Sequence, residues 1–174
     1  NYFKLRGSYG IVGNNNGLGD YASQGLFNSA LYGAAPTIFY SQAGNSLLSW
    51  ESSKKTDVGA VFGLFGDRLQ GEITYYENLV DGVILPAPQA PSKGIPNNSV
   101  LINVGSFVNK GWEFSLGGTV LRLGKFSWQS NINFTTANNE VTELAAGNAD
   151  ITGATGGLET ANIIRVGESI GSLY

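Results

Sequence analysis

The side chains that most often perform chemistry in proteins are scarce in this sequence. Its 174 residues include no histidine and no cysteine, which removes His-based triads, Cys–His nucleophiles, thiolate zinc sites and disulfide frameworks. Two carboxylates, Glu140 and Glu143, lie three residues apart where an alternating run gives way to a polar segment. We expect these two carboxylates to be exposed to solvent there and not to act as a general acid and base. We therefore expect no enzyme, and no catalytic, cofactor-binding or metal-binding residues.

Two other ligand patterns are also incomplete. Asn14–Asp20 is rich in Asn and Gly but lacks the spaced carboxylates and final Glu of a calcium loop, so a plain turn is the better interpretation. No Gly-x-x-x-x-Gly-Lys-Ser/Thr stretch occurs. The net charge of −3, without a dense Lys/Arg cluster, argues against a nucleic-acid partner.

Aromatic rings beside neutral polar residues are the feature that best suits a ligand. They lie in a long segment rich in Gly, Ser, Asn and Gln, where rings and amides together would fit a sugar or a peptide. The alternative is that the rings pack within their own loop or against a partner protein. The predicted substrate-binding residues are Tyr21, Phe27, Tyr32, Phe39 and Tyr40.

Paired runs of alternating apolar and polar residues must position any such loop. Thr56–Tyr76 and Gly111–Thr136 each hold two runs joined by a tight turn, at Phe65–Arg68 and Leu123–Lys125. Alternation with period two places the apolar residues on one face of a strand. A further run opens the chain and another closes it, so we expect about six strands. Their ranges are Tyr2–Val12, Trp50–Leu64, Leu69–Asn78, Gly111–Leu121, Phe126–Thr136 and Ile164–Tyr174.

Three long segments separate these elements: Asn14–Ser49, Leu79–Val108 and Ala137–Ile164. The first lacks sustained alternation and is predicted to be a loop. The second contains four of the five prolines, which makes a central strand through Leu85–Pro96 improbable. Within it, Ser99–Phe107 is a candidate strand extension.

The pattern leaves two fold classes open. Charged residues make up 13% of the chain, about half the ~25% of soluble domains, and no apolar run approaches the ~20 residues of a transmembrane helix. Strands of roughly ten residues with a charge-free apolar face and a neutral polar face favour a transmembrane β-barrel. A soluble β-sandwich, whose solvent face should carry more charge, is the alternative.

Loop length then predicts the orientation in a membrane. Short turns would be periplasmic and the three long loops extracellular. Alternation along the strands places three charged residues on the same side as the apolar residues, and all three fall at strand ends: Lys54, Glu77 and Arg122. The aromatics expected near the two interfaces are Trp50, Tyr75, Trp112 and Trp128.

Motifs along the whole chain resemble SusC/RagA-type TonB-dependent outer-membrane transporters of Bacteroidetes. They occur in the order found in that family and with plausible spacing. The stretches concerned are Lys4–Gly10 with Gly13-Asn14, Trp50-Glu51, Lys55–Gly59, Tyr75-Tyr76, Asn103–Gly105, Asn109–Glu113 and Val166–Tyr174.

The resemblance implies that residues 1–174 are part of one receptor β-barrel domain, about six strands of a 22-stranded barrel, with the plug domain and closing strands outside this chain. It also implies a multi-pass protein of the outer membrane, in contact with its lipids. Such a protein imports glycans or peptides, powered by the TonB complex through parts not in this chain. A SusD-like surface lipoprotein would dock on the extracellular loops. The alternatives are a soluble carbohydrate-binding sandwich and a passive porin or adhesin barrel.

Overall fold

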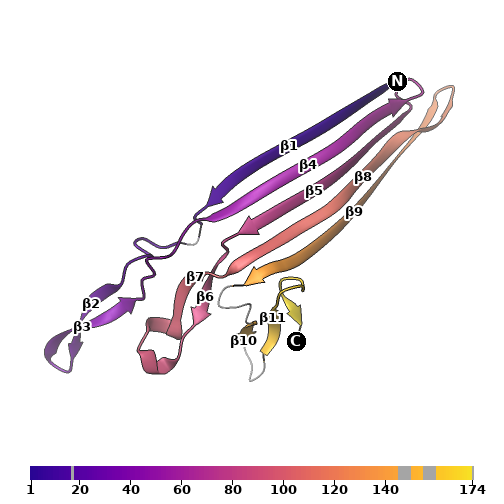
Figure 1. The fold of residues 1–174 in the computed structure, drawn as a ribbon. Helices are drawn as coiled ribbons and strands as arrows, with labels where there is room; N and C mark the ends of the chain where they lie inside the picture. Colours follow the sequence, from indigo (N-terminus) through magenta and orange to yellow (C-terminus); the bar gives the residue numbers. More distant parts are fainter. Residues whose placement is uncertain (17, 145–149, 155–159, 174) are drawn as a thin grey trace.

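The central element of the structure, a computed structural model, is one long antiparallel sheet. The structure describes residues 1–16, 18–144, 150–154 and 160–173. The sheet has the order β1-β4-β5-β8-β9, and its strands run side by side along the long axis of the molecule (Figure 1). Their bounds are Tyr2–Asn14 for β1, Glu51–Leu64 for β4, Leu69–Asp81 for β5, Gly105–Leu123 for β8 and Phe126–Leu144 for β9.

Smaller elements gather at one end of this sheet (Figure 1). A hairpin of β2 (Leu26–Tyr32) and β3 (Ala35–Gln42) lies between β1 and β4 in the chain, and it projects away from the sheet. A second hairpin, β6 (Ile84–Pro88) and β7 (Ser99–Asn103), lies between β5 and β8. Two 3-10 turns, η1 (Pro91–Lys93) and η2 (Pro96–Asn98), connect its strands. Beyond β9 come β10 (Ile151–Ala154), β11 (Thr160–Ile164) and β12 (Ser172–Leu173).

The opposite end carries only the two predicted tight turns. At the β4–β5 turn Phe65, Gly66 and Asp67 all have positive φ, between 56° and 65°, the conformation in which glycine is least strained. Gly124, with φ 56°, makes the β8–β9 turn. Both turns therefore lie where the sequence predicts them, and the long segments all leave from the other end.

The register separates two faces across all five strands. Leu5, Ala60, Ile73 and Phe114 are partners in one row, which continues to Phe134 on β9. We call this side the apolar face. The adjacent row of the other side, the polar face, holds Arg6, Gly59, Thr74, Glu113 and Thr135.

No layer of described residues covers the apolar face. Leu5 is 77% exposed and Ile132 64% exposed, although both lie near the middle of long strands. The apolar side chains that the described structure buries gather instead at the loop end: Val104, Val108, Val141, Leu144 and Ile163. The sheet is thus a single layer, and the two packed sheets of the sandwich alternative are not formed.

Charges bound this apolar face where a membrane would end. On β4 the stretch Thr56–Leu64 carries no charge on that face, and at about 3.3 Å per residue and a tilt of about 40° it rises about 20 Å. An apolar band of about 25 Å is typical of outer-membrane barrels. Lys54 lies just beyond Thr56. Glu77 is the register partner of Thr56, and Lys110, the partner of Glu77, is paired with Glu140 at 3.9 Å. The predicted charges of the apolar face thus lie toward the outer ends of β4 and β5. The prediction is wrong for Arg122, because a bulge between Thr119 and Leu121 places it opposite Ser127 on the polar face.

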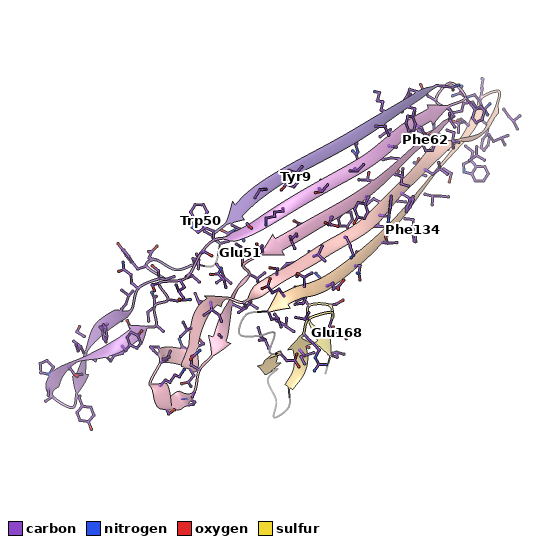
Figure 2. The ribbon with its side chains drawn as sticks, viewed as in Figure 1. Tyr9, Trp50, Glu51, Phe62, Phe134 and Glu168 are labelled. Atoms are coloured by element: carbon purple, nitrogen blue, oxygen red, sulfur yellow. The ribbon has the colours of Figure 1, made fainter. Side chains whose placement is uncertain are left out.

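Aromatic rings line the outer border of this band. The ring centroids of Tyr75 and Trp112 lie 5.1 Å apart, and Trp112 stacks on Phe114 at 6.1 Å. Phe114 in turn contacts Phe134 of β9, whose position is marked in Figure 2. Such rings suit the boundary between lipid and water, where an apolar body meets a hydrated edge. The predicted positions of Tyr75 and Trp112 in the interfacial belt agree with this arrangement.

The long loops contain more structure than the sequence predicts. The segment Asn14–Ser49, predicted as a loop, forms the β2–β3 hairpin, and β6 runs through Pro86 and Pro88. Proline is tolerated because β6 is one of only two strands in its small sheet and not a central strand. The predicted extension at Ser99–Phe107 exists as β7 and the start of β8, separated at Val104. β8 and β9 reach 19 residues each, well beyond the predicted ranges.

The strand predicted at Ile164–Tyr174 is wrong for residues 165–171; within that range the described strand residues are Ile164, the end of β11, and Ser172–Leu173, which form β12. Two consecutive turns occupy residues 165–171, with hydrogen bonds from Glu168 N to Arg165 O and from Ser172 N to Ser169 O. Gly167 and Gly171, at φ 85° and 80°, interrupt the extended conformation. The described wall therefore has five strands, and the segment near Glu168 lies against the outer end of β9 (Figure 2). No helix among the described residues has the length and apolarity to cross a bilayer.

Leu116→Arg tests the assignment of the apolar face. Leu116 lies between Gly71 and Ile132 near the middle of the band, where an arginine facing lipid costs about 2–4 kcal/mol. We expect a lower yield of folded full-length protein in outer membranes, measured by heat-modifiable gel mobility. The neighbouring change Ser115→Arg places the same charge on the polar face and should assemble normally. Equal yields from both variants would contradict the assignment.

Candidate functional site

The five predicted ligand aromatics all lie on or next to the β2–β3 hairpin, but not in one pocket. Phe27 and Tyr40 are register partners, and their ring centroids are 5.0 Å apart. Tyr32 and Phe39 lie on the other face of the hairpin, by the alternation of its strands. Tyr21 lies in the preceding turn, at φ 58°. The structure thus brings together one pair of rings out of five residues.

The hairpin remains exposed on both faces. Tyr32 is 85% exposed at its tip, and on the face of Phe27 the side chains of Leu31 and Ile38 are 71% and 73% exposed. From 21 to 50 the sequence contains no Asp, Glu, Lys or Arg. Large uncharged apolar surfaces are typical of sites that contact a ligand or another protein.

Asn103 ties the base of this hairpin to the neighbouring loop. Its Oδ1 accepts the backbone N–H of Ser49 at 2.9 Å, and its Nδ2 donates to the carbonyls of Ser49 at 3.0 Å and Gly82 at 2.6 Å. Asn45 adds a hydrogen bond to the carbonyl of Leu101 at 2.9 Å. One side chain therefore satisfies backbone groups from two segments that are distant in the sequence.

Glu51 makes a second clamp at the point where the wall meets the two hairpins (Figure 2). Its Oε1 accepts the backbone N–H of Ile84 at 2.9 Å, and its Oε2 accepts Nδ2 of Asn14 at 2.8 Å. The carboxylate thus joins the end of β1 to the start of β6. Sequence reasoning noticed Glu51 and Asn103 only as family motifs and missed these roles, because the partners are backbone groups.

A shallow hollow of about 210 Å³ lies between the hairpin base and η2. Its polar lining comes from Ser41, Gln42, Asn97 and Ser99. None of these side chains is charged, so the hollow suits a neutral ligand group that both donates and accepts hydrogen bonds. A larger hollow of about 500 Å³, beside Leu116 and Ile132, opens on the apolar face and therefore faces lipid.

Ionisable groups at the loop end serve as anchors. Ser106 donates its hydroxyl to Asp81 at 2.7 Å, and Lys54 Nζ lies 3.6 Å from the same carboxylate. The hydrogen bond from Ser106, with a smaller contribution from Lys54, lowers the pKa of Asp81. Among the described residues no cluster of three or more acidic side chains could hold a metal ion.

The segment after β11 is anchored in a similar way. Arg165 donates to both carboxylate oxygens of Asp150, with Nη2 2.8 Å from Oδ2. These bonds, and to a lesser extent the charge of Arg165, lower the pKa of Asp150. Asn139 of β9 accepts the backbone N–H of Ile170 at 2.9 Å, and Val141 donates its N–H to the carbonyl of Glu168.

These features define a class of protein: a wall sector of a transmembrane β-barrel whose outer end carries clamped hairpins. The profile of the family described as TonB dependent receptor-like, beta-barrel matches residues 1–162. The chain belongs to this family, and it is part of an outer-membrane β-barrel of the SusC/RagA type.

Individual relatives agree with this membership. The TonB-dependent receptor P39 of Formosa agariphila is 34% identical over all of this chain and 16% of its own length. The TonB-dependent receptor SusC of Bacteroides thetaiotaomicron is 30% identical over 83% of this chain and 15% of its own. A structure of the RagAB peptide transporter superposes with a TM-score of 0.82 at 29% identity, covering 98% of this chain and 18% of that one. The chain therefore spans less than a fifth of the length of these proteins, and they are receptors and transporters, not enzymes.

Asn103→Ala tests the clamp. Removing the side chain leaves the N–H of Ser49 and the carbonyls of Ser49 and Gly82 without their partner. A hydrogen bond contributes about 1 kcal/mol net, so we expect amide exchange at residues 47–49 to become about fivefold to tenfold faster. Hydrogen exchange with mass spectrometry on the full-length protein measures this. Asn28→Ala on the exposed hairpin is the control, and exchange that stays unchanged in Asn103→Ala would contradict the clamp.

The two lowered pKa values predict how the anchors respond to acid. A carboxylate whose folded pKa lies below its unfolded value stabilises the fold at higher pH, and this contribution is lost as the pH falls through the folded pKa. The stabilisation by Asp81 and Asp150 should therefore be complete above about pH 4. It should decrease as the pH falls below the ordinary carboxyl pKa of about 3.8 toward the lowered pKa of each group.

Carboxyl ¹³C shifts measured against pH report each group separately. Arg165→Ala should raise the pKa of Asp150 and leave that of Asp81 in place, whereas Ser106→Ala should do the reverse. A titration of Asp150 that does not respond to Arg165→Ala would show that the ion pair is not formed in solution.

Proposed function

We propose that residues 1–174 form part of one barrel domain, of 22 strands, in a TonB-dependent transporter that imports nutrients across the outer membrane. The observation that carries this is the single-layer sheet with an uncovered apolar face, together with its similarity to the RagAB peptide transporter over 98% of the chain. In this arrangement the apolar face contacts lipid and the polar face lines the lumen. The clamped hairpins face the outside of the cell.

The imported substrates are oligosaccharides or peptides. Neutral hydroxyl and amide groups line the hollow at the hairpin base, and exposed rings extend along β2 and β3. Rings stack on apolar faces of sugars and on peptide side chains, while amides and hydroxyls exchange hydrogen bonds with neutral ligands. Tyr21, Phe27, Tyr32, Phe39 and Tyr40 are the proposed contacts. Transport requires no catalytic residue, which agrees with the composition of the chain.

A SusD-like surface lipoprotein is the proposed partner on the extracellular side. The support is the uncharged, exposed apolar surface of the β2–β3 hairpin, which is typical of a protein contact. The TonB complex would act through the plug, which lies in parts of the protein outside these residues. Energy coupling is thus a property of the whole transporter.

Dependence on TonB separates this function from passive diffusion. In cells that express the full-length protein as their one transporter of this type, uptake of its substrate should stop when TonB is deleted. The measurement is growth or labelled uptake on panels of oligosaccharides and peptides as sole nutrients, with and without TonB. Growth that continues at the same rate in the TonB-deleted strain would indicate a passive porin instead.

A further inference from the structure

One side chain of the polar face crosses a whole strand. Arg6 of β1 is the register partner of Gly59 on β4, and Gly59 is the partner of Thr74 on β5. The guanidinium of Arg6 extends past Gly59, where its Nη2 donates to Thr74 Oγ1 at 2.7 Å and forms an ion pair with Glu72. The Thr74 hydroxyl also donates to Glu72, at 3.3 Å. Three strands are therefore joined by one set of side chains.

Gly59 leaves the space through which Arg6 passes. A Cβ at this position would lie 2.9 Å from Thr74 Oγ1, 2.9 Å from the carbonyl oxygen of Ile73 and 3.0 Å from Arg6 Nε. All three distances are at or below the closest approach of a real Cβ, and one of the atoms is rigid backbone. Because the φ of Gly59 is not positive, glycine is required here for space and not for backbone conformation.

The crossing also pairs two of the charges on the polar face. The polar face is neutral at Ser115, Asn131 and Asn133, as the sequence predicts, whereas β1, β4 and β5 carry charged residues on it. There the charges are mostly paired, Arg6 with Glu72 and Lys55 with Asp57 at 3.6 Å. Ser8 adds a hydrogen bond to Asp57 at 3.2 Å.

The crossing is specific to one alignment of the strands. A slip of one residue turns Arg6 to the other face. A slip of two in one direction places Arg6 against Val61, whose branched side chain blocks the path over β4. A slip of two in the other direction places it against Asp57, which would pair with the guanidinium on β4 and leave Glu72 and Thr74 without it. Compared with these two slips, the native register alone presents a glycine beneath Arg6.

Other directly opposed pairs show the same complementarity of size. Tyr2 lies over its partner Gly63, and Phe62 lies over its partner Gly71 on the apolar face. The hydroxyl of Tyr76 would lie 2.8 Å from a Cβ at its partner Gly111. Arg6 differs from these aromatic residues because it continues to a third strand.

We propose that the Arg6–Gly59 crossing is a register lock: it selects the native alignment of β1, β4 and β5 when the wall assembles. A half-exposed ion pair contributes only about 1 kcal/mol, so the lock acts mainly by favouring one register over the neighbouring ones. The crossing also holds the guanidinium flat against the lumenal wall, where it neutralises Glu72.

Disulfide cross-linking of engineered cysteine pairs in the full-length transporter measures which residues of β1 and β4 lie opposite each other. Leu5→Cys with Ala60→Cys joins native partners, whereas Leu5→Cys with Phe62→Cys or with Val58→Cys joins residues that meet after a slip of two. Arg6→Gln removes the guanidinium without adding bulk. We expect the ratio of slipped to native cross-links to rise about fivefold, the change that about 1 kcal/mol produces. An unchanged ratio in Arg6→Gln would overturn the proposal.

Two glycine variants provide the matched comparison. Gly59→Ala adds a methyl group beneath Arg6, whereas Gly10→Ala adds the same group to the polar face of β1, where nothing lies within 4 Å. Gly59→Ala should lower the heat-modifiable folded fraction and raise slipped cross-links, and Gly10→Ala should match the parent. Equal behaviour of the two would also overturn the lock. If Gly59→Ala fails to fold at all, the Arg6→Gln ratio still decides.

Discussion

The pairing of backbone groups in lipid is the constraint on which the rest of this structure depends. The interior of a bilayer offers no hydrogen-bond partner for an N–H or a carbonyl. Every strand of the wall must therefore pair its backbone N–H and carbonyl groups with those of the neighbouring strands. Neighbouring strands meet this requirement through ladders of 13 or more residue pairs, with two bulges between β8 and β9. In the described sheet β1 and β9 are the edges, and each pairs on one side. Side chains are then free to face lipid on one side and the lumen on the other. This is why a sheet with almost no buried side chains in its middle is the stable arrangement.

The same requirement takes a different form where the strands leave the membrane. There the ladders open, and the chain changes direction at Gly82 and Gly105 between β5 and β8. Backbone groups near these bends are satisfied by side chains, with Asn103 and Glu51 each serving two segments. The few buried apolar residues, such as Val104 and Val141, are found at this level too. These hydrogen bonds therefore fix the bases of the two hairpins, although their tips are exposed.

Prediction from sequence succeeded where alternation and turn chemistry agree. The β4–β5 hairpin was expected at Trp50–Leu64 and Leu69–Asn78, and its strands lie within three residues of those limits. Prediction failed for β2 and β3, because a hairpin exposed on both faces does not need alternating apolar and polar residues. It also failed within Ile164–Tyr174, where two glycines with positive φ turn an apolar run into consecutive turns. The five aromatics predicted to bind a ligand lie close together in the sequence, yet among them only the rings of Phe27 and Tyr40 are in contact.

The amino-acid sequence by itself favoured a barrel wall over a sandwich and determined which end carries the short turns and which the long loops. Period two, a face free of charge, and short turns opposite long loops are properties of neighbouring residues, and they need no knowledge of distant contacts. Only the tertiary structure decided which side chains meet across strands. Arg6, Gly59 and Glu72 are far apart in the chain, and the guanidinium reaches Glu72 because the register places a residue without a side chain between them. Register is a property of pairing between strands, so no single stretch of sequence contains it.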